Sequence, residues 1–133
     1  RTLGEWLFAG SIVEWQGDDA IFELRNYIES GEFIEFLIPG GLSNLQLTLT
    51  EFEDAESGEI TPKVSAGQGK KIRIRPDKWA CGVAEAKRLL PQYTIARKPQ
   101  GLKGENAEMY GRKLAEFGEL CRGEREERET DND

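Results

Sequence analysis

The chain has 133 residues, of which 38% are hydrophobic and 32% are charged, and its formal net charge is −7. This length and composition are typical of one small soluble domain, and the negative charge by itself argues against a protein that coats nucleic acid or an anionic membrane. The sequence contains no histidine, which excludes Ser-His-Asp and Cys-His catalysis and most zinc sites.

The first forty residues predict three strands. Residues 5–16 are apolar and aromatic without a helical period, which indicates a strand that Gly10 interrupts. Residues 20–29 are a second strand candidate, although their pattern also fits a helix. Residues 33–38 are the third, and the turn signal that begins at Pro39 ends it.

Alternation between leucine and polar side chains is clearest in residues 45–50. It predicts a strand with one core face and one polar face. If this strand continues unbroken, Phe52 lies on the polar face with Thr48 and Thr50. Residues 53–69 are rich in polar residues, glycine and proline, and we expect them to form a loop.

A basic strand and a helix follow. In the strand predicted over 71–75, two isoleucines face one side and three basic residues face the other. A helix predicted over 76–90 begins at a proline and ends before another one. Residues 93–97 predict a short strand. The helix has an apolar stripe at spacings of three to four residues, made of Trp79, Val83, Ala86 and Leu90.

A second apolar stripe occurs in residues 105–121, at spacings of 3, 4, 3 and 4 residues. Its members are Ala107, Tyr110, Leu114, Phe117 and Cys121. The spacing predicts a helix that is too short to be stable alone, so we expect it to pack on another element. Residues 122–133 are a charge run that predicts a disordered acidic tail.

Together these elements predict an α+β fold, with an antiparallel meander sheet of four to five strands, the helix at 76–90 and a C-terminal helix. We expect residues 1–103 to form a single domain whose sheet-and-helix core spans about 20–90. Residues 104–121 would form an accessory or dimerising helix, and residues 122–133 the tail.

The charge is divided into blocks along the chain. Residues 1–62 have a net charge of −11, residues 63–103 a net charge of +9, and residues 104–133 a net charge of −5. Such asymmetry indicates either contact with nucleic acid or a membrane, or acidic tails. The alternative is that acidic and basic strands neutralise each other across a sheet.

The basic block places cationic side chains on one face of the predicted sheet. Cationic groups on a strand suit phosphate contacts, and an aromatic ring on the same face suits base stacking, for which Phe52 is the candidate. The alternative is a solvated face on which the cations pair with Glu51, Glu53 or Asp54. The cations are Lys70, Lys71, Arg73, Arg75 and Lys78.

Several short motifs occur in a characteristic order between Leu47 and Trp79. They are the pair Glu51-Phe52, the turn Gly58-Glu59, Pro62, the strand GKKIRI and the sequence PDKW. This order, over about a third of the chain, resembles the positive cofactor four family of transcription coactivators. The resemblance implies a four-stranded antiparallel sheet with one long helix, a unit that Whirly proteins share, and dimerisation through the helices.

The resemblance also implies binding of single-stranded or melted DNA on the sheet. Carried over to matching positions, it indicates Phe52, Lys63, Lys70, Lys71 and Arg73 as binding residues, with Trp79 in the core at the start of the helix. Arg75 and Lys78 complete the predicted set because they lie beside these residues in the sequence.

Two other functions fit parts of the sequence. Pro76-Asp77 with Glu85-Ala86-Lys87 spells a metal-nuclease pattern, but two acids eight residues apart on one helix are about 12 Å apart, too far to share an ion. Acidic clusters at 18–19 and 51–56 fit an adaptor or inhibitor that imitates DNA or binds a protein. Its protein contact could also be the stripe formed by Ala107, Tyr110, Leu114 and Phe117.

We therefore predict a non-enzymatic homodimer that binds single-stranded DNA or RNA in transcription or replication, with no metal and no cofactor. Cys81 and Cys121 do not form a disulfide framework, which favours a reduced cytoplasmic, nucleoid or nuclear setting over secretion. No apolar run reaches the length of about 18 residues that a membrane span needs. The predicted binding residues are Phe52, Lys63, Lys70, Lys71, Arg73, Arg75 and Lys78.

Overall fold

The structure is a computed structural model that describes residues 6–41, 43–65, 67 and 69–99. The elements in these residues are β1 (Trp6–Gln16), β2 (Asp19–Leu24), β3 (Ile28–Glu29), β4 (Phe33–Phe36), β5 (Leu45–Thr48), β6 (Phe52–Asp54), β7 (Ile60–Thr61), β8 (Lys63–Val64), β9 (Lys71–Ile74), the 3₁₀ helix η1 (Pro76–Lys78), α1 (Val83–Leu89) and β10 (Ile95–Pro99).

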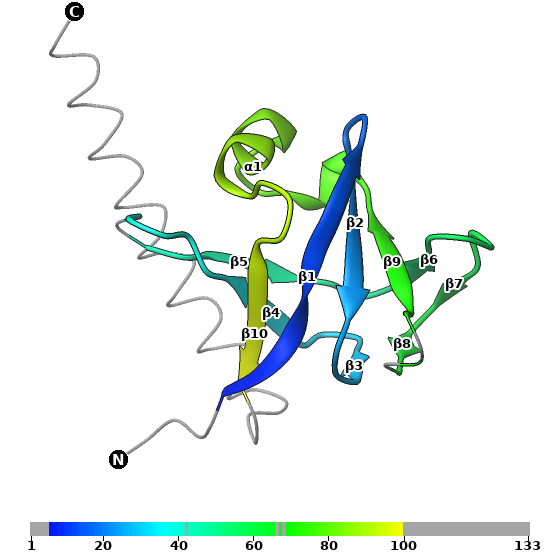
Figure 1. Cartoon of the computed structure of the whole chain (residues 1–133). Helices are drawn as coiled ribbons and strands as arrows, with labels where there is room; N and C mark the ends of the chain where they lie inside the picture. Colours follow the sequence, from blue (N-terminus) through cyan, green and yellow to red (C-terminus); the bar gives the residue numbers. More distant parts are fainter. Residues whose placement is uncertain (1–5, 42, 66, 68, 100–133) are drawn as a thin grey trace, which may run out of the picture.

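Eight of these strands form one antiparallel sheet in the order β5-β4-β10-β1-β2-β9-β6-β7. The sheet curls into a half-barrel, with the long strand β1 near its middle (Figure 1). Strands β3 and β8 form a separate two-stranded sheet. The last strand of the described chain, β10, inserts between β1 and β4, so the order along the sheet is not that of a simple meander.

The expected four- to five-stranded sheet followed by a long helix is therefore wrong. The predicted helix at 76–90 breaks after η1, where Trp79 has extended backbone angles (φ −88°, ψ 114°). It resumes only after Gly82, whose φ of +88° is left-handed and suits glycine. The predicted loop at 53–69 contains two complete short strands and most of a third. The four-stranded sheet with one long helix implied by the family resemblance is not formed.

The apolar stripe that predicted this helix is nevertheless a core feature. Trp79, Ala86 and Leu90 are all buried in the same hydrophobic cluster. The Trp79 ring packs 5.7 Å from Phe36 and 6.0 Å from Trp15, measured between ring centroids. The spacing of three to four residues therefore predicted correctly which residues are buried. The chain between these residues turns and does not form one continuous helix.

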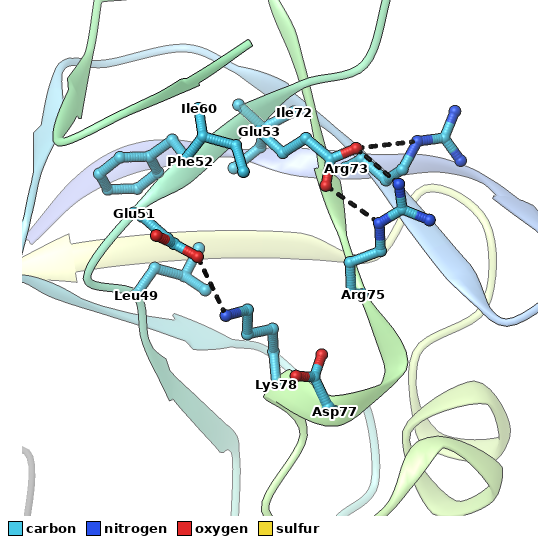
Figure 2. A pocket seen from close by; sticks show the side chains of 10 residues that line it. All are labelled: Leu49, Glu51, Phe52, Glu53, Ile60, Ile72, Arg73, Arg75, Asp77 and Lys78. Atoms are coloured by element: carbon cyan, nitrogen blue, oxygen red, sulfur yellow. Dashed lines mark hydrogen bonds and ion pairs between the residues drawn. The ribbon is translucent and has the colours of Figure 1, made fainter. Parts of the chain in front are cut away.

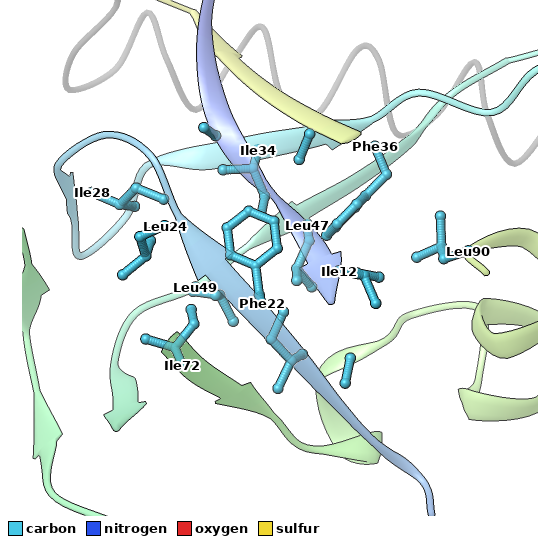
Figure 3. Close-up of a cluster of buried hydrophobic side chains, with 14 of the residues drawn as sticks. Ile12, Phe22, Leu24, Ile28, Ile34, Phe36, Leu47, Leu49, Ile72 and Leu90 are labelled. Atoms are coloured by element: carbon cyan, nitrogen blue, oxygen red, sulfur yellow. The ribbon is translucent and has the colours of Figure 1, made fainter. Parts of the chain in front are cut away.

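The inner face of the half-barrel holds the core (Figure 3). Phe22 and Phe36 meet edge to face at 5.8 Å between ring centroids, and both are fully buried. Burying aromatic rings of this size provides much of the stability of a small domain. Because side chains alternate along each strand, every second side chain points to the outer face of the half-barrel. The outer face is therefore the one available for contacts with solvent or partners.

Several strand predictions are confirmed by the structure. The strand expected over 5–16 forms β1, and the interruption expected at Gly10 is a bulge in its pairing with β10. The strands expected at 33–38 and 71–75 form β4 and β9. The helix expected at 104–121 and the tail at 122–133 lie outside the described residues.

The helices in the described part of the chain are η1 and α1. None of its helices is long and apolar enough to cross a membrane.

Candidate functional site: the ion-paired face of strand β9

Strand β9 lies between β2 and β6, and its two faces separate as predicted. Ile72 and Ile74 are each 1% exposed and belong to the core, whereas Lys71 and Arg73 face the other side. Arg73 lies directly opposite Ile21 on one neighbouring strand and Glu53 on the other. The antiparallel pairing thus places an acidic residue beside the central arginine.

Two arginines and two carboxylates form a network on this face, which we call the β9 ion-pair cluster (Asp19, Glu53, Arg73 and Arg75). Arg75 donates two hydrogen bonds to Glu53, from Nε at 3.0 Å and from Nη2 at 2.8 Å (Figure 2). Asp19 accepts from Arg73 at 3.0 Å and from Arg75 at 3.1 Å. The hydrogen bonds from Arg75 to Glu53 raise the pKa of the Arg75 guanidinium. Both arginines are therefore occupied by carboxylates of the same domain.

Two lysines that flank the cluster are also paired. Lys70 forms an ion pair with Asp54. Lys78 approaches Glu51 at 3.7 Å between Nζ and Oε1 (Figure 2). The structure thus forms the pairing of β9 cations with Glu51, Glu53 and Asp54 that was the alternative to phosphate binding. Neutralisation within the domain lowers the positive potential that attraction of nucleic acid requires.

Phe52, the expected base-stacking residue, lies in the core and is only 1% exposed. Strand β5 ends at Thr48, and β6 begins at Phe52 as a new strand paired with β9 and β7. The alternation continues through Leu49 and breaks where Thr50 and Glu51 are both exposed, so parity counted from Thr48 no longer applies to Phe52. A fully buried ring has no free face for a base, so Phe52 does not occupy the stacking position expected of it.

The two remaining predicted residues are not members of the cluster. Lys71 is opposite Glu23 in the pairing of β9 with β2. Lys63 is exposed on β8, in the two-stranded sheet, where it lies opposite Glu29. The structure therefore brings together only part of the predicted set, and each of these two lysines lies opposite an acidic residue.

Four of the predicted residues line one open cavity of about 180 Å³ beside the cluster (Figure 2). Apolar side chains form part of its wall, and three acidic and three basic side chains form the rest. Its volume is below the range of about 300–1,000 Å³ that is typical of small-molecule sites. The lining residues are Leu49, Glu51, Phe52, Glu53, Ile60, Ile72, Arg73, Arg75, Asp77 and Lys78.

The residues of the nuclease pattern do not form a metal site in the structure. Asp77 lies in η1, while Glu85 in α1 forms an ion pair with Arg88. Lys87 donates to the backbone oxygen of Gly17 at 2.8 Å. Within the described ranges, no group of three or more potential metal-ligating side chains occurs.

Glu53 was one of the acidic partners expected for the cations, whereas Asp19 was indicated only as part of the acidic cluster at 18–19. Asp19 follows the turn at Gly17 and is the first residue of β2. The hairpin between β1 and β2 places its carboxylate next to β9. The acidic block in the first half of the chain indicated that carboxylates were available to pair with the basic residues. Only the strand order identified Asp19 as a partner of Arg73 and Arg75.

Asp54 provides a test of these ion pairs by pH. Lys70 and the backbone N–H groups of Ser57 and Glu56 donate to its carboxylate and hold its pKa well below the usual value of 3.8. A carboxyl group whose pKa is lower in the folded state stabilises the fold above the unfolded pKa, and this contribution is lost as the pH falls toward the folded pKa. Asp54→Asn keeps an oxygen that can accept both N–H groups but removes the charge.

We expect Asp54→Asn to lower the urea midpoint of unfolding at pH 7 and to lose this difference progressively below about pH 4. Urea titrations of both proteins from pH 7 to pH 3 measure the difference. A constant difference across this range would show that the Asp54 charge is not coupled to folding.

A scan against protein-family models and a search of curated proteins find no match to the chain. Two solved structures are similar in fold, one described as the "C-terminal domain of Geobacillus thermoleovorans putative U32 peptidase" and the other as the selenomethionine variant of that domain. Their TM-scores are 0.51 and 0.50, each with 21% sequence identity. The matches cover 70% and 69% of this chain, and 92% and 99% of those chains. At this identity, the likeness shows the fold alone.

Proposed function

We propose that this chain is a non-enzymatic protein-binding domain that holds one apolar side chain of a partner in the cavity beside β9. The observation that carries the proposal is the composition of that cavity, which combines an apolar wall with equal numbers of acidic and basic residues. Protein interfaces commonly have this anatomy, with an apolar centre inside a polar rim.

The charge of the cavity supports a protein partner over a nucleic acid. Arg73 and Arg75 already share Asp19 and Glu53, and a phosphate would have to displace these carboxylates. A partner with side chains of both signs can bind around the rim without such displacement. The role in single-strand binding stays a prediction, and the experiment below includes an arm that tests it.

The size of the cavity supports a single side chain as its occupant. About 180 Å³ holds a group of the size of a leucine or methionine side chain, and it is too small for a typical ligand. Ile60 on strand β7 forms one side of the opening and is 56% exposed. An apolar side chain that enters would cover Ile60 and remove it from water, which favours binding.

The fold likeness is consistent with this proposal. The similar solved structures are described as a C-terminal domain of a larger protein, so domains of this fold occur beside other domains. We extend that arrangement to this chain as part of the proposal: the domain would contribute contacts and no reacting groups.

A peptide-display experiment tests the proposal with a matched pair of variants. A random peptide library is selected on the full chain, and binding of the selected peptides is measured on Ile60→Asp and Ile95→Asp. Ile95 is 47% exposed and lies on β10, five strands from Ile60 in the sheet order, so the two changes are alike but on different surfaces. We expect the peptides to share one apolar residue and to bind Ile60→Asp at least about tenfold more weakly, a loss of about 1.4 kcal/mol.

The same two variants provide the control and the results that would contradict the proposal. Ile95→Asp should bind the peptides as the unchanged chain does, because its charge is far from the cavity. Equal binding to both variants would refute the cavity as the site. A gel shift of oligo(dT) that depends on Arg73 and Arg75 and weakens steeply with salt would support the nucleic-acid role instead.

A further inference from the structure

The two edges of the eight-stranded sheet differ in how they are protected from pairing with another strand. At one end, β7 is only two residues long, and Glu59, Pro62 and Lys63 flank it. Short strands, charges and proline are features with which proteins block a sheet edge. At the other end, β5 has four residues, and residues 36–50 around it contain no charge in a chain of which 32% is charged. The β5 edge therefore lacks the protection that the β7 edge has.

The pairing of β4 determines which backbone groups of β5 face the sheet. Leu37, directly after β4, donates its N–H to the carbonyl of Ile95 on β10 at 2.9 Å. In an antiparallel ladder the N–H and C=O of one residue point to the same neighbouring strand, and those of the next residue point to the opposite side. Phe36 therefore faces β5, where it lies opposite Leu45. The backbone groups of Leu45 accordingly face β4.

The open edge of β5 consists of the backbone groups of Gln46 and Thr48. By the same alternation Leu47 faces β4, and these two residues face away from the sheet. The N–H of Gly31 donates to the carbonyl of Leu49 at 3.0 Å, which agrees with this alternation. Within the residues that the structure describes, the N–H and C=O groups of Gln46 and Thr48 have no hydrogen-bond partner. Such an edge is a template for one more strand.

Exposed apolar side chains on the inner strands do not offer such a template. Phe8 on β1 and Ile95 on β10 are 46% and 47% exposed. Both strands lie inside the sheet, and each is paired with a strand on either side. A partner can contact these positions through side chains only, whereas the open backbone groups of β5 specify an extended strand as the occupant.

The sequence of β5 is complementary to a second copy of itself. Two antiparallel copies satisfy the open groups when Gln46 of each lies opposite Thr48 of the other, with Leu47 at the two-fold axis. This register places Leu45 opposite Leu49 of the other copy, so apolar residues pair with apolar and polar residues with polar. Because residues 36–50 contain no charge, no like charges meet along this edge.

We infer that the chain forms a two-fold symmetric dimer in which β5 pairs antiparallel with β5 of a second copy. The pairing hydrogen-bonds the open backbone groups of Gln46 and Thr48 in both copies and joins the two sheets into one. This inference does not rest on the proposed function, because β5 and the strand of Ile60 are at opposite ends of the sheet order.

Analytical ultracentrifugation of the full chain over a range of concentrations tests the inference with a matched pair of proline variants. Thr48→Pro removes an N–H that points out of the sheet, so the dimer loses hydrogen bonds while the fold of each copy keeps its own. Ile60→Pro makes the same change at the β7 edge, where the bond from the Asp54 N–H to the Glu59 carbonyl shows that the next residue faces outward. We expect Thr48→Pro to raise the dissociation constant of the dimer at least about tenfold and Ile60→Pro to leave it unchanged.

Amide hydrogen exchange of the unchanged chain, followed by NMR, is a second test that does not depend on a variant that folds. Above the dissociation constant of the dimer, the N–H groups of Gln46 and Thr48 should exchange at least about tenfold more slowly than below it, because they exchange only from the monomer. The N–H of Ile60 should exchange at the same rate at both concentrations, since its edge stays open.

Three results would each overturn the inference. The first is a chain that stays monomeric at all concentrations, and the second is a dimer that Thr48→Pro does not weaken although circular dichroism shows the variant to be folded. The third is exchange at Gln46 and Thr48 that does not depend on concentration. Slow exchange of these two groups in the monomer would assign the edge to another segment of the same chain.

Discussion

Replacing Gly10 with alanine should lower the free energy of unfolding by about 3 kcal/mol. Gly10 lies at the bulge of β1, where a Cβ atom would be 2.1 Å from the backbone oxygen of Glu23 and 2.8 Å from the Phe22 ring. The backbone oxygen belongs to the paired strand β2 and the ring is fully buried, so neither moves without disturbing the sheet or the core. Urea unfolding measured by tryptophan fluorescence reports the change.

Gly17→Ala is the matched control for this prediction. Gly17 has a φ of +63°, but a Cβ atom there would have no neighbour within 4 Å. The substitution therefore costs only the backbone strain of alanine in the left-handed region, about 1 kcal/mol. If Gly10→Ala were no more destabilising than Gly17→Ala, the close approach of β1 and β2 at the bulge would not be as the structure shows.

Replacing Arg97 with alanine is expected to have an effect of similar size, about 3 kcal/mol. Arg97 donates to Glu35 Oε1 from Nη2 at 2.6 Å and from Nε at 2.9 Å. Glu35 is only 3% exposed, and its other contacts are the side-chain amides of Asn44 and Gln46. Without Arg97 the carboxylate stays buried with no opposing charge, which is the costly way to break an ion pair.

Two further variants isolate this cause. Arg25→Ala removes an arginine that is 58% exposed and 3.3 Å from Glu23, and it should change stability by less than about 0.5 kcal/mol. Glu35→Gln combined with Arg97→Met removes both charges, and this double variant should be more stable than Arg97→Ala alone. If the double variant were instead as unstable as Arg97→Ala, loss of packing around Trp6 would explain the effect better than the buried charge.

The ion pairs also explain how a chain with a net charge of −7 can have a strongly basic block. Residues 63–103, with a net charge of +9, include strand β9. In the sheet, β9 lies between β2 and β6, and both of these strands belong to the acidic block of residues 1–62. Asp19 comes from one neighbouring strand and Glu53 from the other. Charge separated along the sequence is thus neutralised across the sheet, which was one of the two interpretations the sequence left open.

The pattern of β9 was predictable because it depends only on neighbouring residues. Alternation of isoleucine with basic residues over 71–75 indicated a half-buried strand, and Ile72 and Ile74 are indeed core residues. Phe52 could not be placed in the same way, because its orientation depends on where β5 ends. Two consecutive exposed residues, Thr50 and Glu51, shift the parity by one, and no local signal in the sequence identified that shift.

The helix at 76–90 was overpredicted for a related reason. The apolar stripe indicates which residues are buried, but it does not by itself indicate a helix. Burial of every third or fourth residue also occurs when a chain turns across the surface of a core. Trp79, Ala86 and Leu90 enter one cluster from η1, α1 and their connections. Gly82 is the residue that separates these pieces, and its left-handed conformation became visible only in the structure.

The sequence alone therefore determined the strands with clear alternation, the interruption at Gly10 and the identity of many core residues. These features follow from local periodicity and from the conformational freedom of glycine. Only the tertiary structure decided the eight-stranded order, the carboxylate partners of Arg73 and Arg75 and the exposure of Phe8 and Ile95. Each of these depends on which distant strands become neighbours, and that is set by the packing of the whole half-barrel rather than by any single segment.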